Sequence, residues 1–177
     1  MYANFPIKDI VMINKMKGLL IKKEQDLVYL LFILSINTGM KLKDLLNLKV
    51  KDVKNKRYLN LGKNKIIPLH EEICELINNI AKDITNDEEY LFKSKAGHIL
   101  DRIFVFNAFK SICIQLGVQD KYSVASWRKT FAYHYYQRYK DLSYLQWLFN
   151  QSTVEQTLNY IDVDENMNLR FREGVSL

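Results

Sequence analysis

Apolar side chains recur at helical spacing along most of this sequence, which restricts the chain to a mainly helical fold. Leu27, Leu30, Leu31 and Leu34 follow the i, i+3, i+4, i+7 pattern that forms an apolar stripe on one face of a helix. Gly39 follows Asn-Thr and is typical of a helix stop. Further helices are expected over residues 7–18, 42–48, 70–82, 103–116, 124–139, 142–149 and 154–161.

One short region has the composition and turn chemistry of a β-hairpin. Residues 58–61 and 66–69 flank a Gly-Lys-Asn-Lys turn at residues 62–65. Only 2 prolines and 6 glycines occur in 177 residues, which excludes collagen, proline-rich linkers and a β-sandwich with many tight turns. The expected fold class is therefore α+β and mostly helical, with one small antiparallel hairpin sheet.

The length suits a single domain, and several classes of protein are excluded by the pattern of apolar residues. We expect one globular domain over residues 1–161 and a C-terminal tail or arm over residues 162–177. The longest apolar run, residues 27–36, is shorter than the ~20 residues that span a bilayer, so no membrane partner is expected. Because no basic region followed by an apolar stretch opens the sequence, we expect a cytoplasmic protein.

Neither the histidines nor the cysteines have the spacing of a metal site, and motifs for cofactors are missing. The sequence has no glycine-rich phosphate loop, Gly-x-Ser-x-Gly elbow or His-Glu-x-x-His motif. We therefore expect no metal and no cofactor. Lys and Arg number 26 against 20 Asp and Glu, for a net charge of +6. That excess is compatible with a polyanionic partner but does not require one.

Four separated segments carry the informative residues. They are NTGMKLKDLLNL at residues 37–48, the hairpin that ends at residues 68–69, SWRKTFA at residues 126–132, and LFNQS at residues 148–152 followed by TLNY at residues 157–160. In this order they resemble the catalytic domain of the tyrosine recombinases, or phage integrases. The chain most resembles short, stand-alone Gram-positive members that lack an N-terminal core-binding domain.

The resemblance assigns roles to residues in these segments, because the family cleaves DNA by attack of a tyrosine on a phosphodiester. Tyr160 matches the nucleophile, and Arg128 matches the second of two arginines. Lys41 stands at the first arginine position, and Gln151 stands at the second histidine position, nine residues before Tyr160. By residue type alone, Arg128 is more often a buried arginine paired with Asp44 or with a backbone carbonyl, and Tyr160 is more often a surface tyrosine. The Arg-Lys-Thr-Phe context of Arg128 and the spacing from Thr157 to Tyr160 favour the family roles instead.

Several positions depart from the family pattern. The hairpin lysine aligns with Lys63, although Lys65 or Asn60 also fits the short hairpin. Ala125 occupies the first histidine position and can neither donate a hydrogen bond nor transfer a proton, a function typically worth ~10²–10⁴ in rate. Lys41 keeps a positive charge but lacks the planar fork of arginine. The resemblance therefore implies a family member with a degenerate active site.

These features lead to one main hypothesis and two alternatives. The main hypothesis is a DNA-binding regulator or accessory factor, catalytically impaired or inactive, whose partner is double-stranded DNA. Lys43, Lys65 and Lys129 are expected to contact that DNA, and the tail after residue 161 is expected to join protomers of a homo-oligomer on it. The first alternative is an active site-specific recombinase that uses Tyr160 through a 3′-phosphotyrosyl intermediate. The second alternative is a protein-interaction module.

Overall fold

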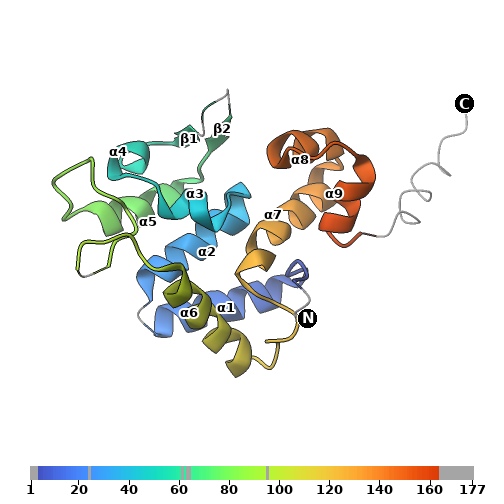
Figure 1. Cartoon of the computed structure of the whole chain (residues 1–177), viewed down its shortest axis with the longest axis horizontal. Coiled ribbons are helices and arrows are strands. Elements are labelled where there is room, and N and C mark those ends of the chain that lie inside the picture. Colours follow the sequence, from blue (N-terminus) through green and yellow to red (C-terminus); the bar gives the residue numbers. More distant parts are fainter. Residues whose placement is uncertain (1–3, 24, 61, 63–64, 95, 164–177) are drawn as a thin grey trace, which may run out of the picture.

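The computed structural model describes residues 4–23, 25–60, 62, 65–94 and 96–163, and it is mainly helical (Figure 1). Its elements are α1 (Ile10–Lys22), α2 (Asp26–Thr38), α3 (Leu42–Leu46), α4 (Val50–Val53), β1 (Tyr58–Asn60), β2 (Ile66–Pro68), α5 (Glu71–Ala81), α6 (Arg102–Gln115), α7 (Val124–Tyr139), α8 (Leu142–Phe149) and α9 (Val154–Tyr160). Within the described residues the sheet consists of β1 and β2, which are antiparallel with Leu59 opposite Ile67. None of the described helices is long and apolar enough to cross a membrane.

The centre of the core is an aromatic cluster that joins three helices. Trp127 of α7 lies edge-on to Phe32 of α2, with ring centroids 5.4 Å apart, and to Phe109 of α6 at 5.0 Å. All three side chains are fully buried, and edge-on contacts of this kind add to the stabilisation that burial provides. Because Trp127 directly precedes Arg128, this packing also fixes the part of α7 that carries the arginine.

The bounds of α1 differ from those predicted by the periodicity. The helix begins at Ile10 because the side chain of Asp9 caps it, accepting a hydrogen bond at 2.8 Å from the main-chain N–H two residues on. It continues through Gly18 to Lys22, so the predicted stop at Gly18 is wrong. Leu20 is fully buried, and the free energy of burying this apolar turn outweighs the weak helix preference of glycine.

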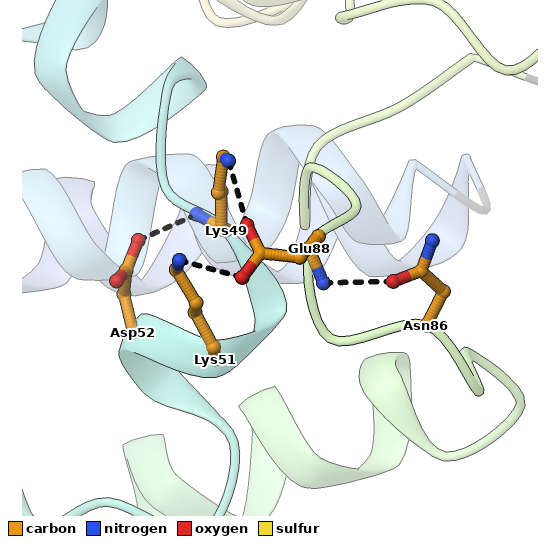
Figure 2. A network of polar contacts seen from close by, with 5 residues as sticks. All are labelled: Lys49, Lys51, Asp52, Asn86 and Glu88. Carbon is orange, nitrogen blue, oxygen red and sulfur yellow. Dashed lines mark hydrogen bonds and ion pairs between the residues drawn. The ribbon is translucent and has the colours of Figure 1, made fainter.

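Helix α4 was not predicted, because four residues are too few to show a helical period. Main-chain hydrogen bonds from Val50 to Glu89 and from Lys51 to Asp87, both 2.9 Å long, join it to the loop before residue 90, and an ion network lies over them (Figure 2). Glu88 accepts from the ammonium of Lys51 at 2.7 Å and from that of Lys49 at 2.9 Å, while Asp52 accepts from the main-chain N–H of Lys49 at 2.9 Å. Hydrogen bonds from Lys51 and Lys49 lower the pKa of Glu88 to about 2.

Candidate functional site

The end of α2 forms a turn that offers a carbonyl group to α7. Gly39 adopts a left-handed conformation with φ 68°, and its N–H donates to the carbonyl of Ser35 at 3.0 Å, which confirms the predicted helix stop. The hydroxyl of Thr38 donates to the carbonyl of Leu34 at 2.6 Å and closes the last turn. The carbonyl of Gly39 then accepts from Nε of Arg128 at 2.6 Å.

Arg128 is held from several sides. Besides the bond to Gly39, its guanidinium lies 4.2 Å from the ring centroid of Phe149 and shares a side-chain hydrogen bond with Tyr160. Burial lowers the pKa of Arg128, while Tyr160 and the charge of Asp44 oppose that shift. The backbone-carbonyl partner considered from the sequence is therefore present, and it occupies only one edge of the guanidinium.

Tyr160 is the last residue of α9, and its ring lies among cationic and aromatic side chains. The ring centroid is 5.2 Å from that of Phe149, and the ammonium of Lys129 lies 5.2 Å from the same tyrosine ring. Burial raises the pKa of Tyr160, and the charge and hydrogen bond of Arg128 offset only part of that rise. At neutral pH the phenol is therefore protonated in this structure.

A cavity of about 250 Å³ lies beside Arg128. Its charged lining residues come from three parts of the chain: Lys41 directly precedes α3 and Asp44 lies within it, Lys65 precedes β2, and Arg128 belongs to α7. Asn150 at the end of α8 also lines it. Three cationic side chains against one carboxylate make this cavity attractive to an anion.

Lys65 connects the hairpin to the end of α8. Its ammonium donates to the carbonyl of Trp147 at 2.9 Å and to Oδ1 of Asn150 at 3.1 Å, and it lies 4.9 Å from the ring centroid of Trp147. A positive charge at a helix C-terminus is favourable because the last carbonyls carry partial negative charge. In Figure 1 the hairpin lies to the left of α8, near the top of the view.

The remaining predicted site residues occupy other places. The side chain of Gln151 is bound within its own segment: its Oε1 accepts from the hydroxyl of Thr157 at 2.9 Å, and its Nε2 donates to the carbonyl of Gln156 at 3.5 Å. Lys43 is exposed on α3. Lys63 lies outside the described residues. The structure therefore brings Lys41, Lys65 and Arg128 to one cavity, with Tyr160 in contact with Arg128.

Asn150 is a lining residue that the sequence analysis did not single out. It ends α8 in a left-handed conformation with φ 54° and ψ 47°, which asparagine tolerates better than most residues. Its place directly before Gln151 was the available signal. That signal was weak because an asparagine after a helix is usually read as a cap.

Comparison with known proteins identifies the family. The model described as the phage integrase family matches residues 12–167. The chain belongs to this family. It is 34% identical over 167 residues to the probable integrase/recombinase YoeC of Bacillus subtilis, covering 91% of each chain. It is 27% identical over 143 residues to the tyrosine recombinase XerA of Pyrococcus furiosus, of which it spans 49%. The resemblance found in the sequence is thus confirmed.

Solved structures show the same fold for this integrase-family chain. A crystal structure of XerA recombinase matches with a TM-score of 0.75 at 17% identity, covering 99% of this chain and 67% of that one. The Tn1549 transposon integrase in complex with transposon right end DNA matches with a TM-score of 0.70 at 16% identity, covering 89% of this chain and 61% of that one. These matches confirm the predicted catalytic-domain fold.

Proposed function

We propose that this integrase-family chain binds double-stranded DNA and holds a backbone phosphate in the cavity beside Arg128. The observation that carries the proposal is the gathering of Arg128, Lys41 and Lys65 around one cavity, with Tyr160 hydrogen-bonded to the arginine. A guanidinium donates to phosphate oxygens with matched planar geometry, and the ammonium groups add charge. Relatives named as recombinases, and a solved neighbour in complex with DNA, support this assignment.

Lysines around the cavity are proposed to extend the contact to adjacent phosphates. Lys129 lies beside the ring of Tyr160, and Lys43 is exposed on the same short helix as Asp44. Each phosphate neutralised by a lysine releases counterions, so binding should weaken steeply as salt rises. Lys49 and Lys51 are expected to contribute less, because Glu88 already pairs with both.

We infer that DNA cleavage by this chain is slow or absent, and that it acts as a regulator or accessory factor. Ala125 is exposed and has no side-chain group that transfers a proton, and such a group is typically worth ~10²–10⁴ in rate. Lys41 presents a single ammonium where a planar fork would bind two phosphate oxygens. Burial also raises the pKa of Tyr160, which disfavours the phenolate that attacks phosphorus.

The alternative function is a working recombinase with Tyr160 as its nucleophile. The observation that favours it is the hydrogen bond between Tyr160 and Arg128, which lowers the pKa of the phenol against the effect of burial. A bound phosphate would place its phosphorus next to that pair. The two functions therefore share one binding site and differ in the rate of a single chemical step.

A nicked suicide duplex separates the two functions. The chain is incubated with nicked duplexes whose sequence comes from the DNA that flanks its gene. Denaturing electrophoresis would then show a covalent protein–DNA adduct if Tyr160 attacks. Our proposal predicts salt-sensitive retention of DNA without an adduct. An adduct that disappears in Tyr160→Phe would establish the recombinase instead. If the chain fails to retain DNA at about 50 mM salt, DNA binding is excluded and the protein-interaction module remains.

The predicted tail concerns assembly on DNA. Residues 164–177 lie outside the described residues, whereas Ile161 and Val163 are buried. We propose that the tail joins protomers on DNA, so removing residues 164–177 should abolish higher-order complexes while single-protomer binding continues. If the truncated chain keeps both the higher-order complexes and single-protomer binding, this role of the tail is excluded. The cytoplasmic location and the boundary at residue 161 stay predictions.

A further inference from the structure

Asn150, and not Gln151, lies at the cavity that we assign to a DNA phosphate. Asn150 lines the cavity together with Arg128 and Lys41. The two ends of the Gln151 amide are instead bound to Thr157 and to the main chain of α9. The short LFNQS segment therefore presents its asparagine to the cavity and turns its glutamine toward α9.

Lys65 determines which end of the Asn150 amide is available. The ammonium of Lys65 lies 3.1 Å from Oδ1 of Asn150 and 3.4 Å from the carbonyl oxygen of Leu148. A lysine ammonium only donates hydrogen bonds, so the amide atom that faces it must be the oxygen. The NH₂ group of Asn150 is then the other end of the amide, and no hydrogen bond joins it to another described residue.

We propose that Asn150 is a phosphate-binding residue, whose NH₂ group donates to a non-bridging oxygen of the DNA phosphate held by Arg128. This inference rests on the proposed function and adds a ligand to that site. Lys65 acts as a positioning residue, because it holds the amide oxygen and so turns the two amide donors away from itself. A neutral donor also limits the cationic crowding beside Arg128 and Lys41.

A purely structural role for Asn150 is separable from this one. As the residue that ends α8, Asn150 must hold a positive φ, and glycine does so without steric cost. Asn150→Gly therefore keeps the backbone and removes only the side-chain amide. A cap residue replaced in this way would lose little, whereas a phosphate ligand would lose its donors.

The test is fluorescence anisotropy of a labelled duplex, with the full chain and a series of salt concentrations. Asn150→Gly should weaken binding roughly 10-fold, the scale of one hydrogen bond to a charged group. The slope of log Kd against log salt should not change, because a neutral donor displaces no counterion. Asn150→Asp, which keeps an oxygen for Lys65, should weaken binding more than Gln151→Glu, the same change of charge one residue away.

The outcomes distinguish this inference from the function on which it rests. The inference is overturned, and the function stands, if the unmodified chain binds the duplex and Asn150→Gly binds it equally well. Thermal unfolding would first show that the Asn150→Gly variant is folded. A loss in Gln151→Ala without one in Asn150→Gly would return the role to Gln151. A change of about one in the salt slope of Asn150→Gly would mean that Lys65 was displaced, which also overturns the inference. If the unmodified chain binds no DNA, both fail.

Discussion

Gly39 connects the stability of the fold to the geometry of the site, so Gly39→Ala is an informative change. The added Cβ would lie 2.6 Å from Cδ1 of Phe131 and 3.3 Å from a methyl carbon of Leu148. The residue also holds φ 68°, which an L side chain resists, and its carbonyl accepts from Arg128. One methyl group thus strains the backbone, presses on a packed ring and disturbs the anchor of the arginine.

The expected loss of stability has two parts. The left-handed conformation costs alanine roughly 1–2 kcal/mol, and forcing a methyl group into packed side chains costs roughly 1–3 kcal/mol. Gly39→Ala should therefore lower the free energy of unfolding by roughly 2–5 kcal/mol. For a chain of this size that corresponds to a fall in Tm of about 4–20 °C.

Thermal or urea unfolding followed by circular dichroism measures this loss, and Gly117→Ala is the matched control. Gly117 has φ 67°, but an added Cβ there would meet no atom within 4 Å, so only the backbone part of roughly 1–2 kcal/mol applies. Gly39→Ala should be the less stable of the two. If both variants lose the same stability, Phe131 and Leu148 do not press on Gly39, and the packing described for this turn is wrong.

Three further predictions concern titratable groups. Replacing Arg128 with glutamine removes a charge and a hydrogen bond that lower the pKa of Tyr160, so the pKa of Tyr160 should rise further. An ultraviolet titration measures this pKa as the difference between proteins with and without the Tyr160→Phe substitution. Glu88 has its pKa lowered from 4.5 to about 2, so its contribution to stability is complete above about pH 4.5 and is lost as the pH falls through about 2. The stability advantage of the unmodified chain over Glu88→Gln, measured by urea unfolding, should shrink over that range. Burial raises the pKa of Cys113 to about 12, so a thiol reagent at about pH 8 should modify half-buried Cys74 and leave Cys113 intact by mass spectrometry.

Each of these three predictions has an outcome that would contradict the physical cause given for it. An unchanged or lower tyrosine pKa in Arg128→Gln would mean that the two side chains do not interact in solution. A constant difference between the unmodified chain and Glu88→Gln from pH 6 to about pH 2 would exclude the ion network as its source. Rapid labelling of Cys113 in the folded protein would show that its helix opens readily.

Much of the fold was predictable because most of the longer helices carry a local apolar pattern of their own. The leucines of α2 and the glycine that ends it specify that helix locally, and its stop falls where the sequence places it. Local patterns were less informative where the chain depends on tertiary contacts. Helix α1 extends past Gly18 because Leu20 packs into the core, and α4 is too short to show a period.

The site was predictable only in part, for a different physical reason. The helical period predicts no contact between Arg128 and Tyr160. The expectation that these two residues lie together came from the family resemblance. The role of Asn150 depends on Lys65, which stands 85 positions earlier in the sequence and reaches it from the hairpin. A contact between segments so far apart leaves no local pattern in the sequence, so the place of Asn150 at the cavity follows only from the folded structure.

The central claim is that Arg128 binds a DNA phosphate, and the salt dependence of duplex binding tests it most directly. In a plot of log Kd against log salt, Arg128→Gln should weaken binding and reduce the slope by about one, because one phosphate contact is lost. Lys110→Gln on α6, the same loss of charge away from the cavity, should leave the slope unchanged. Equal slopes and affinities for the unmodified chain and Arg128→Gln would contradict the account.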